Sequence, residues 1–563
     1  MRLHGHNLWF VVLVFVALMA CGCPARYYKA NADHEVYRLV ARKQQCALGR
    51  AATFTIEPPG RSPGEDLRGA KAGPPPAGAL SPDKEAAEKH DGVPPIPGAV
   101  RLGLREALEL AARHSREYRA EKEKLYLTAL ALTAERDQWE PRWSGVLDAN
   151  ATDGDEYAGY GVGSNFSVRQ LLALGGEVTV GLATDLMRYT KGGPTHTATS
   201  LLTVEVLQPL WRNAGRRIAR ENLTQAEREA IYAVRAFERF RKSFCVEVTS
   251  RYYRILQQRD VVQNQWRNYL RLRRSRQDTE AMAEAGELPK LQVDQARQDE
   301  LAAEARWVSA LRQYREQLDQ FKLTLGLPME VAMELDPGEI DRLRQLGLRE
   351  VGLGERRAVE VALSHRLDLL TVADRVGDAE RKVAVARNGL APDANLQLTA
   401  SVPSDGLHKP VKLKPSEGTY SAGLSLGLPL ERTAERNAYR EALIGLEQAR
   451  RNAQELRDEV QLSVRRDLRT LSEAARNYRI QRDSVALAER RVRGTEELLR
   501  RGEATTRDLL EANRALVDAQ NALTQTLIDH ALARLALWRD TELLQVDEHG
   551  VWREVEGNVG PKD

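Results

Sequence analysis

Two stretches of this chain are too long and too regular for an ordinary globular domain. Residues Arg216 to Ala285 run for 70 positions without glycine or proline, and apolar side chains recur at gaps of three and four. This spacing predicts an amphipathic helix, which at ~1.5 Å per residue extends roughly 100 Å. A second long helix is predicted from Ala434 to Arg501. Shorter helical runs follow them, Lys290 to Leu325 and Ala504 to Trp538, so we expect two extended helical hairpins.

The hairpins belong to an internal duplication. "EALELAARHSREY" (Glu106 to Tyr118) matches "RAVEVALSHRLDL" (Arg357 to Leu369), and "GELPKLQVDQA" at Gly286 matches "GEATTRDLLEA" at Gly502. Each copy reads as helix, strands, very long helix, tight turn and returning helix. The first copy carries about 31 extra residues in its strand region, which we expect to form a surface loop.

The pattern divides the chain into six parts. A signal peptide with a lipobox is predicted at 1–20, followed by a lipidated N-terminus and Pro/Gly-rich tether at 21–100. The first repeat covers 101–328, with strands in 142–210 and a tip at 285–290, and a connecting segment follows at 329–350. The second repeat covers 351–544, with strands in 393–430 and a tip at 501–506, and a tail follows at 545–563.

The N-terminus has the pattern of a secretory signal. Arg2 precedes an apolar run from Leu8 to Ala20, which is too short for a membrane-spanning helix. The run ends in "LMAC", which resembles the lipobox of bacterial lipoproteins and predicts lipidation at Cys21, with Cys23 as the alternative. An ordinary cleaved signal is the other interpretation. No disulfide framework is expected from the remaining cysteines.

The strand regions alternate in polarity. In "DANLQLTASV" the residues Asn395, Gln397 and Thr399 face one way, while the intervening leucines face the other. In the first copy "SNFSVRQLLALGGEVTVGLAT" and "TATSLLTVEVLQPL" alternate in part, and Gly175 with Gly176 is predicted to form a turn. We predict one strand pair in each copy. Four strands cannot close a membrane barrel or leave open edges in lipid. Four strands from each of three chains would make a closed barrel of twelve.

Three motifs carry a family resemblance. They are "LQPLWRNAGR", its second-copy counterpart "LGLPLERTAER", and "RRGEATTRDLLEANRALVDAQNAL" from Arg500 to Leu523. From roughly Leu102 to Leu544 the chain resembles the TolC family of outer-membrane efflux proteins. The resemblance implies a homotrimer in the outer membrane, mainly α with a small β part, in which duplicated helical hairpins form an α-barrel tunnel through the periplasm below a 12-stranded β-barrel. It also implies two partners, a periplasmic adaptor protein and an inner-membrane transporter.

The resemblance assigns roles to the hairpin tips. It implies that Gly286 and Glu287, with Gly502 and Glu503, dock the adaptor.

Two acidic residues, Asp508 and Glu511, occupy positions where the family has a negative constriction at the periplasmic aperture. The simpler interpretation is a solvated helix face. In the family a basic residue and an acidic partner hold the aperture closed, and this chain has Ala504 and Gln292 at those positions. Arg500, Arg501 and Arg507 are the candidates for holding the aperture closed here.

Other motifs suggest no chemistry. "DANATDGDEYAG" (Asp148 to Gly159) departs from a calcium loop and is interpreted as a polar extracellular loop. "GYGVGSN" (Gly159 to Asn165) lacks the following helix of a phosphate site. His114 and His365 occupy equivalent helix positions without further ligands. We therefore expect no enzyme, cofactor or metal site, and the net charge of +3 indicates no nucleic-acid partner.

The sequence thus predicts the lipid-anchored exit duct of a tripartite efflux system that exports small molecules across the periplasm and outer membrane. A type I protein secretion channel has the same architecture and stays open as an alternative. A lipid-anchored periplasmic coiled-coil scaffold is the alternative without a barrel.

Overall fold

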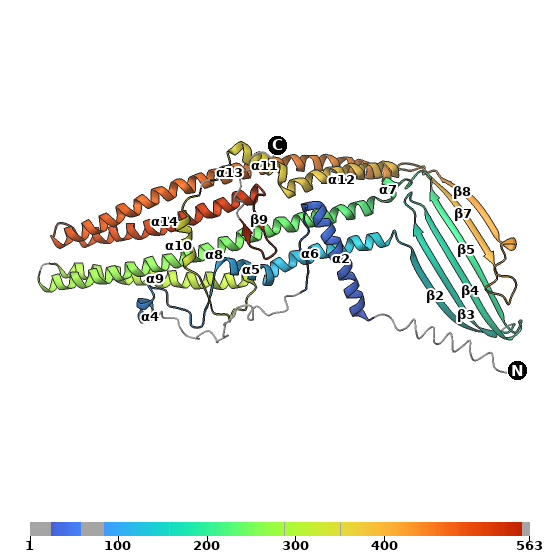
Figure 1. Cartoon of the computed structure of the whole chain (residues 1–563), viewed down its shortest axis with the longest axis horizontal. Helices are drawn as coiled ribbons and strands as arrows, with labels where there is room; N and C mark the ends of the chain where they lie inside the picture. The colour runs from blue at the N-terminus through green and yellow to red at the C-terminus, as the bar shows by residue number, and fades with distance from the viewer. Residues whose placement is uncertain (1–23, 58–83, 157, 287, 350, 554–563) are drawn as a thin grey trace. The chain divides into compact units, whose positions relative to one another are not determined.

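The computed structural model describes residues 24–57, 84–156, 158–286, 288–349 and 351–553 (Figure 1). The chain forms two compact units. The first is drawn from residues 1–55, 124–235 and 372–452, and the second from 56–123, 236–371 and 453–563.

The first unit contains a single antiparallel sheet, shown in Figure 1. Its strands, in spatial order, are β2 (Arg142–Asp153), β3 (Ala158–Leu171), β4 (Glu177–Lys191), β5 (Thr197–Pro209), β7 (Asp393–Pro403) and β8 (Thr419–Gly427). A short 3-10 helix, η1 (Pro415–Glu417), precedes β8.

The sheet corrects two of the predictions. It has six strands rather than four, because the extra residues of the first copy form the hairpin β3–β4 instead of a loop. The acidic stretch that was interpreted as an extracellular loop is mostly strand as well, since Asp148 to Asp153 belong to β2 and β3 begins at Ala158. The alternation in β7 is confirmed: Asn395 pairs directly with Ser425, and Leu396 with Leu424.

Helix α2 (Ala25–Leu48) also lies in the first unit, inside the segment predicted as a tether at 21–100. Val36, Leu39 and Val40 are buried on one of its faces. The Lys43 ammonium lies 2.8 Å from Glu227, and the Tyr126 hydroxyl donates a hydrogen bond to Asp33 over 2.6 Å. This part of the predicted tether is therefore a docked helix.

The helices repeat with the offsets that the sequence predicts. The first-copy helices are α5 (Leu104–His114), α6 (Arg116–Asp137), α7 (Arg216–Ala219), α8 (Glu221–Glu284) and α9 (Lys290–Leu325). Their second-copy counterparts are α11 (Glu355–His365), α12 (Leu367–Gly389), α13 (Thr433–Arg500) and α14 (Thr506–Asp540). His114 and His365 end the equivalent helices α5 and α11, which confirms the duplication.

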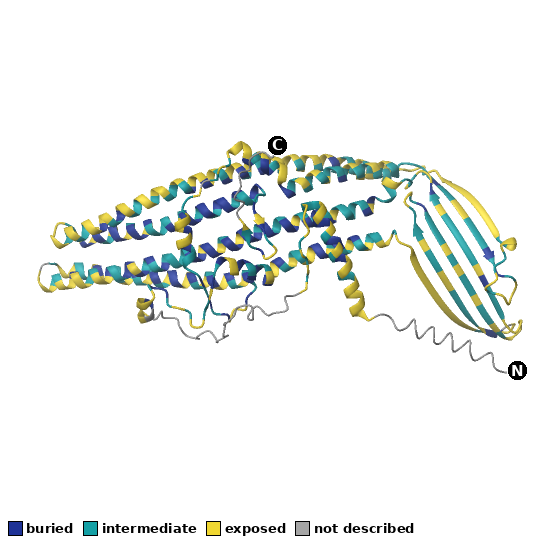
Figure 2. Ribbon diagram, viewed as in Figure 1, coloured by how far each residue is buried: buried dark blue, intermediate teal, exposed yellow. Residues whose placement is uncertain are grey.

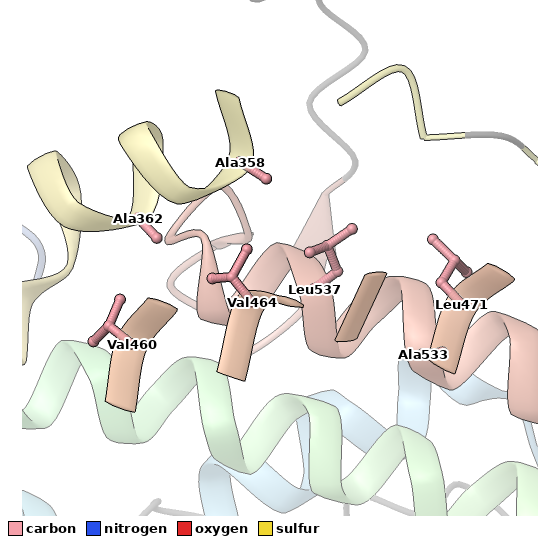
Figure 3. Packing of buried hydrophobic residues seen from close by; sticks show 7 residues of the cluster. All are labelled: Ala358, Ala362, Val460, Val464, Leu471, Ala533 and Leu537. Atoms are coloured by element: carbon pink, nitrogen blue, oxygen red, sulfur yellow. The ribbon is translucent and has the colours of Figure 1, made fainter. Parts of the chain in front are cut away.

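The second unit has its core between helices. One buried cluster joins Ala358 and Ala362 of α11 to valines of α13 and to Leu537 of α14 (Figure 3). Small residues on α11 let the longer helices approach closely. Figure 2 shows that the buried positions follow one stripe of each long helix, as an amphipathic pattern requires.

Short elements complete the second unit. Strand β1 (Val100–Leu102) pairs in parallel with β6 (Met333–Leu335), which is followed by α10 (Gly338–Leu346). Strands β9 (Gln545–Val546) and β10 (Trp552–Arg553) pair near the C-terminus.

The end of the predicted tether is also packed against the second unit. It contains helix α4 (Lys84–Lys89), and beyond it the Trp307 indole N–H donates to the Gly92 carbonyl oxygen over 2.8 Å. The Ile96 amide donates to Glu334 over 2.7 Å. Residues 84–97 are therefore packed structure rather than part of a tether.

Candidate functional site

The two hairpin tips have the same backbone conformation at their glycines. Gly286 between α8 and α9 has φ +81°, and Gly502 between α13 and α14 has φ +73°. A residue with a side chain adopts this left-handed conformation only at a cost, which explains glycine at both turns. At Gly502 the turn is closed by its own amide, which donates to Leu499 over 3.0 Å, and by the Glu503 amide, which donates to Leu498 over 2.9 Å.

The predicted docking residues are exposed where the structure describes them. Gly286, Gly502 and Glu503 are exposed, whereas Glu287 lies outside the described residues. An added side-chain carbon at Gly286 or Gly502 would meet open space. The turns are therefore accessible from outside the chain.

Asp508 forms the start of α14. Its carboxylate accepts hydrogen bonds from the Thr505 amide over 2.9 Å and the Thr505 hydroxyl over 2.6 Å, and its own amide donates back to Thr505. This reciprocal capping box satisfies the otherwise free amides of the first turn. The Thr505 hydroxyl and amide lower the pKa of the Asp508 carboxyl, and nearby Arg491 and Arg507 lower it further. Asp508 is thus a capping residue that stays ionised.

Glu511 lies one turn further along the same exposed face. Its carboxylate pairs with Arg491 of α13 over 2.9 Å, and both side chains are more than half exposed, at 66% and 52%. Leu509 and Ala512 on the other face pack against Ala488 and Val492 of α13. The structure therefore brings Asp508 and Glu511 to one solvated helix face, where each already has a local partner.

Polar contacts connect the two hairpins inside the second unit. We call this set the hairpin seam. It consists of Thr506 with Gln292 at 3.5 Å, Asn264 with Asn521 at 2.8 Å, Thr524 with Asp260 at 3.0 Å, and Arg254 with Asp529 at 2.5 Å.

The hairpin seam does not use the arginines that the sequence suggested as replacements for the family's aperture-closing residues. Arg501 pairs with Glu497 of its own helix, and within the described part of the chain Arg500 and Arg507 form no ion pair. Gln292 instead meets Thr506. The capping box was readable from the Thr-x-x-Asp spacing at Thr505 to Asp508, whereas the contact between Gln292 and Thr506 depends on how the two hairpins pack.

The sheet has one apolar and one polar face, because directly paired residues point to the same side. The apolar face carries Trp143, Leu147, Phe166, Val168, Val180, Leu182, Val204, Val206, Leu396, Leu398, Leu424 and Leu426. The polar face carries Arg142, Asp148, Asn150, Asn165, Arg169, Glu177, Thr179, Asp185, Glu205, Gln397, Thr399 and Ser421.

The part of the chain that the structure describes does not cover the apolar face. Trp143 is 81% exposed and Leu424 is 70% exposed, and Phe166, Leu182 and Leu398 in the inner strands are exposed as well. An apolar surface that extends over six strands marks a face for lipid or for another protein. The opposite face bears the charged residues and is suited to water.

The remaining predicted sites can be placed briefly. Cys21 and Cys23 lie outside the described residues. Cys46 and Cys245 are free thiols. In the described ranges, no group of three or more His, Cys, Asp or Glu side chains could hold a metal ion. Among the helices that the structure describes, none is both long and apolar enough to cross a membrane.

The second repeat matches a known protein family. Residues 358–539 match the model of the outer membrane efflux protein family. The second repeat is therefore similar to the outer membrane efflux protein family. The match begins in α11 and ends at the last turn of α14, so it includes the second hairpin, its tip and the strands β7 and β8.

Solved structures extend the likeness to most of the chain. The outer-membrane channel OprN is 14% identical with a TM-score of 0.56, and the alignment covers 78% of this chain and 89% of that one. The Campylobacter jejuni outer membrane channel CmeC is 14% identical with a TM-score of 0.57, covering 81% and 87%. The Vibrio cholerae outer membrane protein VceC is 14% identical with a TM-score of 0.57, covering 78% and 95%.

At these identities the likeness establishes a shared fold. The fold of the outer membrane efflux protein family therefore spans both repeats of this chain, and the mainly α class with a small β part is confirmed. No curated protein sequence shows significant similarity to the chain.

Proposed function

We propose that the chain is the outer-membrane exit duct of a tripartite efflux system and acts as a transport protein rather than an enzyme. The observation that carries the proposal is the sheet with one exposed apolar face and one polar face, in a chain whose second repeat is similar to the outer membrane efflux protein family. Such a sheet is suited to have lipid on one side and a water-filled lumen on the other.

The assembly that we propose is a homotrimer, whose sheets build a β-barrel in the outer membrane and whose hairpins build a tunnel in the periplasm. The accessible tips at Gly286, Glu287, Gly502 and Glu503 would dock a periplasmic adaptor, which connects the duct to an inner-membrane transporter. Lipidation at Cys21, or at Cys23, would anchor the N-terminus in the same membrane.

Asp508 and Glu511 are proposed to set ion preference at the tunnel entrance. Three copies of each carboxylate would form a negative ring, which favours cations. Asp508 is suited to this role because its capping contacts keep it ionised while its side chain stays on the exposed face.

Fractionation of cells that express the full chain tests the proposal. We expect an SDS-resistant trimer in the outer-membrane fraction that dissociates on heating. A soluble periplasmic monomer would contradict the proposal and favour the coiled-coil scaffold. For the anchor, labelled fatty acid should be incorporated into the native chain and into Cys23→Ser but be lost in Cys21→Ser; the reverse pattern would assign the anchor to Cys23.

A further inference from the structure

We propose that the hairpin β3–β4 gives each copy six barrel strands, and that β8 of one copy pairs with β2 of the next to close an eighteen-stranded barrel. This inference rests on the proposed function for the number of copies. Its own evidence is the geometry of the two sheet edges, which lie within one compact unit of the chain.

Both edges of the sheet are long and uncovered. All nine residues of β8 are exposed, as are eleven of the twelve residues of β2 (Figure 2). Of the named strands, β2 pairs only with β3, and β8 only with β7. Soluble proteins protect such edges, and in lipid an open edge leaves backbone groups without hydrogen-bond partners. The two edges therefore call for a partner strand.

A second copy of the chain supplies the right strand direction. The six strands alternate in direction from β2 to β8, so β2 runs away from the helix-side end and β8 returns to it. Placed beside β8, the β2 of a neighbouring copy is antiparallel to it and continues the alternation. Adding the pair β3–β4 preserves this property, because any even number of strands leaves the two edges opposite in direction.

The register of the sheet has the stagger of a membrane barrel. Arg142 at the start of β2 is linked through directly paired residues to Ser421 of β8, which precedes the end of that strand by six positions. With Gly427 of one copy beside Arg142 of the next, the shift is six residues over six strand spacings, and ~3.3 Å per residue and ~4.8 Å per strand give a tilt of about 35°. Transmembrane barrels have tilts of about 35 to 45°.

The register between copies follows when the helix-side ends of β8 and of the neighbouring β2 are placed at the same height. Gly427 of one copy lies beside Arg142 of the next, which pairs Ser425 with Ser144 on the polar face. On the apolar face Leu424 then meets Gly145, Tyr420 meets Ala149, and Leu426 meets Trp143. Both faces of the sheet continue across the contact without a change of polarity.

The consequence is a wider lumen at the outer membrane. Eighteen strands at this spacing and tilt enclose a barrel about 34 Å across between backbones, whereas twelve strands enclose about 23 Å. The inserted hairpin thus increases the diameter of the β-barrel, whereas corresponding helices of the two repeats have similar lengths. This predicts a duct that admits larger solutes at its outer end than a twelve-stranded duct does.

Disulfide cross-linking tests the contact in membranes. In a Cys23→Ser/Cys46→Ser background, the double variant Ser144→Cys/Ser425→Cys should give a ladder up to the trimer on mild oxidation. Cys245 can remain, because burial raises the pKa of its thiol to about 12 and keeps it unreactive. The matched control Ser144→Cys/Leu424→Cys puts the thiols on opposite faces and should stay monomeric, as should either single variant.

The outcomes separate this inference from the proposed function. A trimer in the outer membrane that cross-links neither through Ser425 nor through the shifted pair Ser144→Cys/Ser421→Cys would overturn the edge pairing and leave the duct intact. A soluble monomer would overturn both. Cryo-electron microscopy of the native trimer then measures the barrel diameter: about 34 Å supports eighteen strands, and about 23 Å would place β3–β4 outside the ring.

Discussion

The two helical hairpins agree in length and tip geometry but differ in how they are packed. Trp266, Tyr269, Trp307, Tyr314 and Phe321 are buried along the first hairpin, where the Trp266 and Trp307 rings lie 4.6 Å apart between centroids. The second hairpin is closed by small and aliphatic residues, namely Ala488, Val492, Leu509, Ala512, Leu516 and Ala519.

The difference teaches that duplication preserved the lengths and left the packing free to diverge. Large rings bury more apolar surface per residue and fix the distance between helices. The first hairpin is also covered by residues 84–97, through the bond from Trp307 to Gly92. We therefore expect the second hairpin to open more readily, held to the first by the hairpin seam.

The largest effect is expected from the aromatic core. Trp307→Ala removes a fully buried ring and its hydrogen bond to Gly92, and should lower the free energy of local opening by about 3 to 5 kcal/mol. Leu516→Ala in the second hairpin should cost only about 2 kcal/mol, because its small neighbours contact less of it. Hydrogen exchange of peptides from α9 and α14 measures both. Equal losses of opening free energy in the two variants would contradict the comparison. Leu291 is 77% exposed, so Leu291→Ala serves as a neutral control.

A smaller effect on stability is expected at the hairpin tips, where a matched glycine substitution should have the opposite sign. Gly502→Ala forces a side chain into the left-handed conformation and should destabilise the turn by about 1 to 2 kcal/mol. Gly494→Ala, eight positions earlier inside α13 with open space around it, should stabilise the helix by about 0.5 to 1 kcal/mol. Thermal unfolding of the helices compares them. A stabilising Gly502→Ala would remove the stated reason for glycine at the tips.

A pH effect of on the order of 1 kcal/mol is expected at Asp467, which lies near Asp540 in the second unit. Burial, followed by the charge of Asp540, raises the pKa of the Asp467 carboxyl to about 7 from its usual 3.8. The native state therefore holds this proton more tightly than the unfolded state. Its contribution to stability is present below pH 4 and is lost as the pH rises towards 7.

The variant Asp467→Asn tests this sign. It should unfold at a higher denaturant concentration than the native protein at pH 8 and show a flatter dependence on pH between 4 and 7. Exposed Asp518→Asn on α14 is the control and should follow the native curve. A native protein whose stability rises through this range would contradict the assignment to Asp467.

The smallest stability effect is expected at Glu511. Its ion pair with Arg491 is exposed, so Glu511→Gln should change the unfolding free energy by less than about 0.5 kcal/mol. A larger loss would mean that Glu511 has a structural role in the second hairpin.

The sequence predicts the helices well because their signals are local. Long runs free of proline, and matched glycines at the tips, indicate both hairpins and their common lengths without any knowledge of packing. The capping box at Thr505 and Asp508 belongs to the same class of signal.

The sequence predicts the turn at Gly175 and Gly176 between β3 and β4, but it gives too few strands for the first copy because the glycines of β3 look like a loop signal. Gly161 and Gly163 lie on the polar face of β3, under side chains from the neighbouring strands, and Gly159 lies close to the backbone of β4. A side-chain carbon at Gly161 would lie 2.2 Å from the Asn150 amide oxygen, so the glycines make room for β2 rather than for a turn. That requirement depends on strand pairing, which no single strand reveals. The hairpin seam was hidden for the same reason, since its partners are far apart in the chain.

The central claim is that the chain forms a conducting duct, and single-channel recording in planar bilayers tests it most directly. The native trimer should open as a cation-selective channel, and Asp508→Ala/Glu511→Ala should keep the openings but lose the selectivity, while Asp518→Ala leaves both unchanged. No openings from a confirmed folded trimer would contradict the account.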